Sequence, residues 1–344
     1  MTGSASVFVE RPGTLTTVQD CGRPGWQHLG VVPSGAMDRG SLQLANALVG
    51  NSLDLAGLEI TLRGPILLFQ CDTLLAVTGA QFDARLTSEG VDFPFPLNRP
   101  VLLHAGDRLT INQPFHGFRA YLALAGGIDI APILGSRCTY LAAAMGGVEG
   151  RALKKGDSLP LASDAHSLAH TRFKQLIKHL VSTALQPPSV RWSVAPISLP
   201  YDEPTVVRCV DGRHRHLFTP EALAAFESGS YRISPQSNRM GYRMLGARLE
   251  RAQSVDILSE PTALGSVQVP PDGLPIVLMA DHQTTGGYAK IAEVATADIG
   301  RLAQLRPGQE VRFVRCTLSD ALALAQAEHQ ALQVAVLAIS QKYS

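Results

Sequence analysis

Short apolar runs, set closely between turn residues, are the feature that most restricts how this chain can fold. The runs are rich in Val, Ile, Leu, Thr and Phe, and 31 glycines and 22 prolines punctuate the 344 residues. Runs of this length and composition predict β-strands. Many short strands with frequent turns are typical of barrels and sandwiches, so we expect a mostly β protein with a few helices and not parallel βαβ layers.

The few helices are predicted from the residues at their ends. Asp38 is a suitable N-cap for a helix that stops near Gly50. Thr219, followed by proline and glutamate, is a strong start for a second helix. Helical patterns also cover residues 297–305 and 318–338. The last is long and alanine-rich, and it packs either against a lobe of the protein or against a partner.

Charge and cysteine content exclude several classes of protein. The formal net charge is +1, whereas a broad nucleic-acid surface normally needs a strong basic excess. We find no 18-residue apolar stretch and no basic segment followed by an apolar one at the N-terminus, so we expect neither a membrane span nor a signal peptide. Five widely spaced cysteines without a C-x-x-C motif fit the cytoplasm better than a disulfide framework or a zinc site.

One eight-residue pattern occurs twice. Residues 23–30 and 239–246 both read R-x-G-[WY]-x-x-L-G. We interpret the pair as the trace of a duplication that produced two similar lobes, since two copies are too few for a solenoid. The aromatic residues at the matched positions, Trp26 and Tyr242, either pack within the lobes or form a platform for a ligand.

The segment with the densest chemistry is residues 268–290. An apolar strand, 276–280, leads into a loop with a carboxylate, an imidazole, an amide, two hydroxyls and two adjacent glycines. Adjacent glycines permit positive φ and let backbone N–H groups approach a ligand. Lys290 follows on the next predicted strand, although only six of the 30 basic residues are lysine. A loop that only reversed the chain would need far fewer functional groups, so we expect a binding or catalytic site here.

Ordered blocks across most of the chain resemble the carboxyltransferase A/B-type proteins. This family includes second allophanate-hydrolase-like subunits, Kip-type antagonists and a subunit of bacterial ATP-dependent 5-oxoprolinase. The matching blocks include residues 12–25, 34–38, 58–62, 77–80, 135–139, 237–243 and 268–290.

The resemblance implies two cyclophilin-like β-barrel lobes. We place an N-terminal lobe at residues 1–162, a connector with a helix over 167–183 at residues 163–200, and a C-terminal lobe with a terminal helix at residues 201–344. The site is expected between or beside the lobes.

The resemblance also implies an activity, with alternatives left open. The first is opening of 5-oxoproline to glutamate with ATP, together with a Kip inhibitor-like B subunit and an A subunit. Carboxyl transfer from biotin is the second, although this chain has no biotinyl segment of its own. The third is a regulatory protein that antagonises a kinase inhibitor. No Walker A motif occurs, so ATP is expected to bind either to a partner subunit or across the interface with one, with Mg²⁺ as a candidate companion ion.

Candidate site residues follow from the chemistry of lactam opening, which needs cations, N–H donors and carboxylates. For catalysis we select Asp20, Asp38, Arg239, Asp281 and Lys290. For binding of substrate or nucleotide we select Arg23, Ser34, Asn46, Asn238, Gln268, His282, Gln283, Thr284, Thr285, Gly286, Gly287 and Tyr288.

Several of these residues have an equally good structural interpretation. Asn46 either binds substrate or ends the first helix. His282 either orients the loop or transfers a proton. Glu59, in an apolar strand, is either catalytic or paired with an arginine such as Arg63. His214 and His216 lack a third ligand nearby, so we expect an exposed turn there and no metal site.

Overall fold

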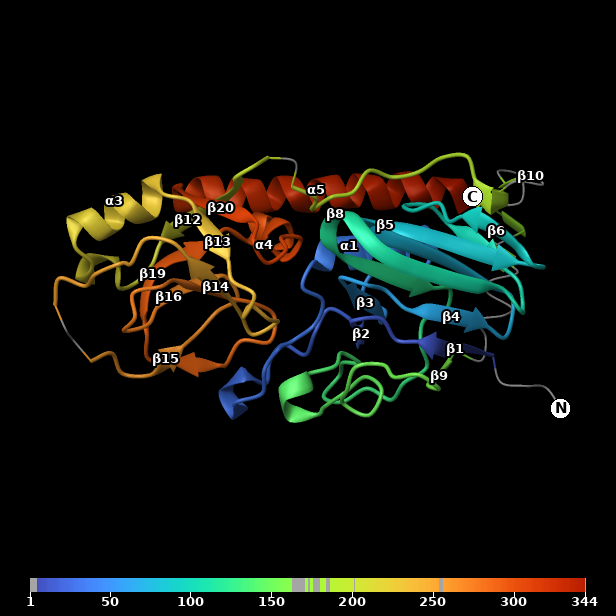
Figure 1. Cartoon of the computed structure of the whole chain (residues 1–344), viewed down its shortest axis with the longest axis horizontal. Coiled ribbons are helices and arrows are strands. Elements are labelled where there is room, and N and C mark those ends of the chain that lie inside the picture. The colour runs from blue at the N-terminus through green and yellow to red at the C-terminus, as the bar shows by residue number, and fades with distance from the viewer. Residues whose placement is uncertain are drawn as a thin grey trace. The chain divides into compact units, whose positions relative to one another are not determined.

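The computed structural model describes residues 5–162, 171–172, 174–175, 180–183, 186–200, 202–253 and 256–343. The chain divides into two compact units (Figure 1). Unit 1 comprises residues 1–22, 38–199 and 331–344, and unit 2 comprises residues 23–37 and 200–330. The ranges expected from the sequence differ from this division, because they placed residues 23–37 in the N-terminal lobe and residues 331–344 in the C-terminal one.

The mostly β class is confirmed, and unit 1 consists mainly of one 11-stranded sheet. Its main path runs β10-β11-β7-β5-β8-β4-β1-β9, while β2 and β3 extend it from β8 and β6 pairs with β5. The strands are β1 Ser6–Arg11, β2 Leu15–Gln19, β3 Gly57–Thr61, β4 Ile66–Phe69, β5 Thr73–Ser88, β6 Val91–Pro94, β7 Val101–Leu103, β8 Arg108–Leu124, β9 Ser158–Pro160, β10 Leu180–Thr183 and β11 Gln186–Val190.

The two longest strands, β5 and β8, pair along most of their length and organise this sheet. Their inward residues alternate with outward ones, and Leu75, Val77, Leu122 and Leu124 are fully or almost fully buried in its core. The helix expected over residues 167–183 lies largely outside the described residues, and its last four positions form strand β10.

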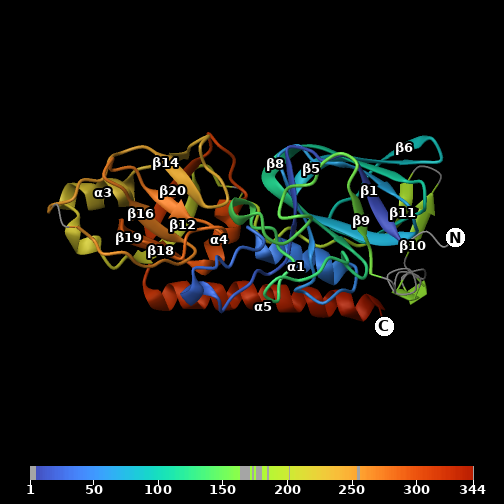
Figure 2. The same cartoon turned by 90° about the horizontal axis from the view of Figure 1, so that it is seen from below.

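Unit 2 is a closed barrel with the strand order β12-β19-β16-β17-β14-β13-β20, which closes through a parallel β12–β20 pair. Its strands are β12 Thr205–Asp211, β13 Tyr231–Ile233, β14 Gly241–Leu245, β16 Ser266–Val269, β17 Ile276–Leu278, β19 Ala289–Val294 and β20 Glu310–Arg315. Strands β15 Glu260–Pro261 (labelled in Figure 1) and β18 Thr285–Gly286 (labelled in Figure 2) form a separate two-stranded ribbon.

Aromatic side chains fill one region of the barrel core. The rings of Phe226 and Phe313 stack with their centroids 4.9 Å apart, and Tyr231 tilts against both. Closing the sheet leaves none of its seven strands with an unpaired edge, which makes the barrel a firm support for the loops that leave it.

The predicted helix starts are confirmed. Helix α1 spans Arg39–Leu48, and the Asp38 side chain accepts a hydrogen bond from the Ser41 N–H at 3.1 Å. Gly50 follows with φ of 69°. The other α-helices described are α3 Pro220–Ser228, α4 Thr296–Ala303 and α5 Leu318–Tyr343, with 3-10 turns η1 Gln27–Leu29, η2 Leu141–Ala143 and η4 Arg215–Leu217.

Helix α5 corrects one expectation. It is 26 residues long and contains an 18-residue window with a mean hydropathy of 1.2, so by length and composition it could cross a membrane, whereas we found no such apolar stretch in the sequence. The cause is its high alanine and leucine content with few charges. Within unit 1, Leu332 and Ile339 are buried, and the Tyr343 hydroxyl donates a hydrogen bond to the Leu48 carbonyl at the end of α1.

The repeated eight-residue pattern does not mark equivalent structures. Both copies lie in unit 2. The first copy forms an exposed loop with the turn η1, and its Trp26 is 37% exposed. The second forms strand β14, and its Tyr242 is in the barrel core. The arginines do agree, because Arg23 and Arg239 are both buried. The interpretation as a duplicated lobe element was therefore wrong.

We predict that Thr219→Ala destabilises unit 2, because the Thr219 hydroxyl accepts the Ala222 N–H at 3.1 Å and caps α3. The expected loss is about 1 kcal/mol, measured by chemical denaturation. Thr219→Ser keeps the cap oxygen and should lose much less. Equal losses in the two variants would show that the hydroxyl does not cap the helix.

Candidate functional site

The predicted strand and loop at residues 276–290 are present in unit 2. Strand β17 ends at Leu278, and the polar loop then leads through β18 of the ribbon to β19. Asp281, His282 and Lys290 are buried, whereas Thr285, Gly287 and Tyr288 are exposed. The polar segment is therefore divided between groups that face the protein and groups that face solvent.

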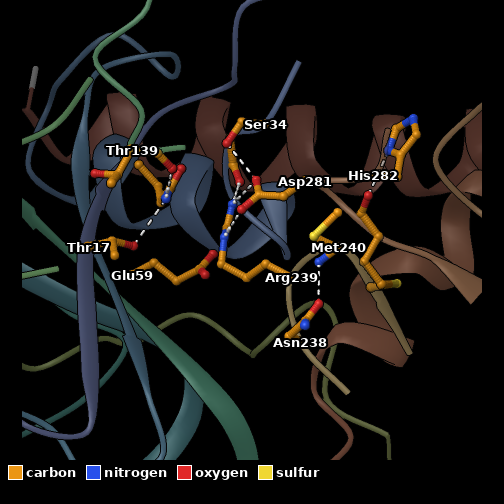
Figure 3. A network of polar contacts seen from close by, with 12 residues as sticks. Thr17, Ser34, Glu59, Thr139, Asn238, Arg239, Met240, Asp281 and His282 are labelled. Carbon is orange, nitrogen blue, oxygen red and sulfur yellow. Dashed lines mark hydrogen bonds and ion pairs between the residues drawn. The ribbon is translucent and has the colours of Figure 1, made fainter. Parts of the chain in front are cut away.

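Asp281 is the acceptor in a buried hydrogen-bond network (Figure 3). Its Oδ2 accepts from Arg239 Nε at 2.9 Å, and its Oδ1 accepts from Arg239 Nη2 at 3.0 Å and from the Ser34 hydroxyl at 2.6 Å. Arg239 Nη2 also donates to the Gly35 carbonyl at 2.6 Å. Asp281 and Arg239 thus tie the loop at residues 34–35 to the loop after β17, which brings three of our candidate residues together.

The geometry of this network favours a structural role for Asp281. Three charge-assisted bonds occupy most of the positions at which its carboxylate can accept a hydrogen bond. Ser34 is held at φ of 56°, a conformation that few residues other than glycine adopt. Such a conformation persists only where surrounding contacts hold it, and the Asp281 contact is one of these.

His282 points back at its own loop (Figure 3). Its Nδ1 lies 2.7 Å from the Met279 carbonyl, which can only accept, so Nδ1 carries the proton. The ring is 5% exposed, and burial lowers the pKa of His282 below its ordinary value, with the Met279 contact opposing that shift. The imidazole is therefore neutral at pH 7, and its contacts match the loop-orienting interpretation.

A second polar cluster surrounds Lys290. Its Nζ lies 2.9 Å from Glu260 Oε1 and donates to the Pro261 carbonyl at 2.6 Å. Arg213 Nη1 lies 3.2 Å from Glu260 Oε2. The hydrogen bond from Lys290, followed by smaller charge effects, lowers the pKa of Glu260. Sequence reasoning missed Glu260, since a single glutamate in a two-residue strand gives no signal before the ribbon is known.

His214 extends this cluster. Its Nδ1 lies 3.8 Å from Glu260 Oε1 and accepts the Lys290 backbone N–H at 3.2 Å. Burial lowers the pKa of His214, although Glu260 opposes the shift. In the described part of the chain, no group of three or more His, Cys, Asp or Glu side chains could hold a metal ion.

Gln268 is the neighbour of Lys290 across the β16–β19 pair. It is 1% exposed, and its Nε2 has no hydrogen-bond partner among the described residues. A Cβ atom built on Gly286 would lie 2.9 Å from this nitrogen. Gly286 and Gly287 do not adopt positive φ, so the conformational reason that we gave for these glycines was wrong. They are instead required because a side chain at either position would meet close neighbours such as Gln268 and Ile257.

The other predicted binding residues either make local hydrogen bonds or are exposed to solvent. The Gln283 carbonyl accepts from the Thr262 hydroxyl, and the Thr284 carbonyl accepts from the Thr262 N–H at 3.0 Å, so both stabilise the ribbon. Asn238 is exposed, and its side chain accepts from the Met240 N–H at 2.8 Å. Tyr288 is 45% exposed.

The candidates in unit 1 are held by local structure. Asp20 accepts from the Gly22 N–H at 2.8 Å, the Ser136 hydroxyl at 2.7 Å and the Arg137 N–H at 2.5 Å. Asn46 donates to the Leu55 carbonyl at 2.7 Å, which fits the helix-ending interpretation.

Asp38 caps α1 and also accepts from the Ser198 hydroxyl at 2.8 Å. Glu59 accepts from the Tyr121 hydroxyl at 2.9 Å, and its Oε1 lies 3.8 Å from Arg119 Nε, which fits the interpretation as the partner of an arginine.

Comparison with known proteins shows the family. The chain matches the carboxyltransferase domain, subdomain A and B, over residues 29–315, and it therefore belongs to that family. It is 41% identical to the C-type subunit of the 5-oxoprolinase of Escherichia coli K12 over 91% of this chain and 92% of that protein. It is 36% identical to the C-type subunit from Haemophilus influenzae over 90% of each chain.

The solved structure of the Kluyveromyces lactis urea amidolyase is also similar. Its TM-score is 0.83 with 32% identity, and the match covers 96% of this chain but 20% of that much longer one. The similarity extends through both units of this chain, which agrees with the resemblance drawn from sequence blocks.

We predict that Asp281→Asn strongly destabilises unit 2, because it leaves the buried Arg239 guanidinium without its counter-charge. Breaking a buried pair on one side costs about 3–5 kcal/mol, which denaturation would measure. Glu310→Gln, which removes the exposed partner of Arg232, is the control, with an expected change of at most about 1 kcal/mol. Similar small losses in both variants would contradict the structural role of Asp281.

We predict that the protein loses stability as pH falls below about 6.5, the ordinary His pKa. Because the folded-state pKa of His282 is lowered, the unfolded chain takes up a proton there before the folded chain does, and acid favours unfolding. The decline in melting temperature between about pH 7 and 5 should be shallower in His282→Gln than in the control His216→Gln, an exposed residue. Equal declines would show that His282 is not buried in its neutral form.

Proposed function

We propose that this chain is the C-type subunit of an ATP-dependent 5-oxoprolinase, which opens 5-oxoproline to glutamate. The observation that carries the proposal is the 41% identity to a subunit of that name over nearly the whole of both proteins. A shared name across a full-length match supports shared assembly, so partner subunits of the A and B types are part of the proposal. The protein is assigned to the cytoplasm, in keeping with five free cysteines.

Binding of Mg²⁺-ATP is assigned to a partner subunit on the sequence of this chain. The chain has no Walker A motif, and its described residues include no acidic cluster fit for a metal. ATP activates an amide by phosphorylating its oxygen, and we assign nucleotide binding to a partner subunit. The contribution of this chain is then to bind and orient the lactam or the glutamate product with fixed donors and charges.

Carboxyl transfer is the second candidate, and one observation favours it. The match to urea amidolyase is good over both units, and that enzyme's name ties its chemistry to urea. A urea-dependent activity would need a biotin carrier from another polypeptide, since we identified no biotinyl segment in this sequence. Full-length identity is higher to the 5-oxoprolinase subunits, so we rank this candidate second.

The proposal predicts ATP-dependent glutamate release from 5-oxoproline by a mixture of this chain with its A- and B-type partners. Omitting this chain should abolish the release, because the proposal divides the site among the subunits. The measurement is glutamate formed with and without ATP, and a mixture with a biotin carrier and urea is the comparison. Release that continues at full rate without this chain would contradict the proposal, and urea-dependent turnover would favour the second candidate.

A further inference from the structure

The Lys290 cluster lies on the outside of the unit 2 barrel, beneath the β15–β18 ribbon. Val267, Val269, Ala289 and Ile291 point into the barrel core. Since successive side chains on a strand alternate between faces, the intervening Gln268 and Lys290 point outward, and their registered pairing places them side by side.

The ribbon covers these two side chains through only a few contacts. Lys290 Nζ reaches Glu260 Oε1 and the Pro261 carbonyl of β15, while Gly286 of β18 lies directly over Gln268. Each ribbon strand has only two residues, and the ribbon is a sheet separate from the barrel. The ribbon thus contacts the barrel's outer face here through the Glu260 carboxylate, the Pro261 carbonyl and Gly286.

One buried donor beneath the ribbon is not matched by an acceptor, although Lys290 Nζ contacts Glu260 and the Pro261 carbonyl. Gln268 Nε2 is buried, and no hydrogen-bond partner for it occurs in the described part of the chain. An unsatisfied buried donor costs about 1–3 kcal/mol, so a stable fold retains one mainly where something else uses it. Lys290 and Arg213 add two positive charges, and Glu260 is the carboxylate that lies against both.

Glu293 is a further carboxyl near the same charges. Burial raises the pKa of this carboxyl, with Ser266 and Lys290 opposing the shift. One carboxylate at this position is outweighed by the two positive charges of Lys290 and Arg213. If Glu260 moved away, the cluster would therefore present positive charge and an amide donor.

We propose that Lys290 and Gln268 form a binding site for the carboxylate of a small ligand, and that Glu260 occupies this site as an internal substitute until the ligand displaces it. The carboxylate would accept from Lys290 Nζ and Gln268 Nε2, with Arg213 at the rim. The choice of ligand rests on the proposed function, because 5-oxoproline and glutamate both carry a carboxylate. The site itself is argued from the geometry of unit 2.

The test is calorimetric titration of the isolated full chain with 5-oxoproline and with 2-pyrrolidinone, the same lactam ring without the carboxylate. Glu260→Gln removes the internal competitor, so it should tighten 5-oxoproline binding by about tenfold or more. Binding of 2-pyrrolidinone should not change. The matched control Glu310→Gln makes the same substitution in another ion pair of unit 2 and should leave both affinities unchanged.

A second variant separates binding from folding. Gln268→Met removes the unpaired amide at similar volume, so it should weaken 5-oxoproline binding by about tenfold while the melting temperature stays the same or rises. Unchanged or weaker binding in Glu260→Gln, equal tightening for 2-pyrrolidinone, or no carboxylate binding in any variant would overturn the site. Glutamate release that depends on this chain would then still support the proposed function, and carboxylate binding without such release would support the site alone.

Discussion

The buried ion pair between Arg239 and Asp281 is the interaction on which the arrangement of unit 2 depends. Two bonds join the side chains, and two further bonds run from them to Ser34 and Gly35. A buried pair adds little net stability, but loss of either partner leaves a charge that the interior cannot solvate. The pair therefore fixes where residues 34–35 meet the loop after β17. It also disfavours other arrangements of these two loops, because they would leave a buried charge unpaired.

The polar loop after β17 serves two purposes that its sequence does not separate. Its first residues, Asp281 and His282, are buried and satisfied by nearby groups, so they hold the loop in place. Its later residues form half of the ribbon, which covers Lys290 and Gln268. A closed barrel supports both halves. Groups already satisfied by the fold are poor candidates for chemistry, whereas an unpaired buried donor beside a lysine is a good one.

Sequence reasoning found the elements better than it found the site. The strand at 276–280, the Asp38 and Thr219 caps and the density of short strands could be predicted, because periodicity and capping are local. Glu260 could not, since its meaning depends on a ribbon that pairs residues about 25 positions apart. The pattern shared by the segments around Trp26 and Tyr242 led to a wrong interpretation as a duplicated element for the same reason. Tertiary contacts determine the structure of each segment, and one copy forms a loop while the other forms a strand.

We claim that Asp281 has a structural role and not a catalytic one. The activity of a double variant at Arg239 and Asp281 tests this claim most directly. We would measure glutamate release by the three-subunit mixture with Arg239→Met, Asp281→Leu and the double variant. Replacing both members of a buried pair by apolar residues is often tolerated, whereas a single loss is not. Our account predicts that the double variant keeps more activity than either single one. A double variant as inactive as Asp281→Leu alone would contradict it and make Asp281 a catalytic group.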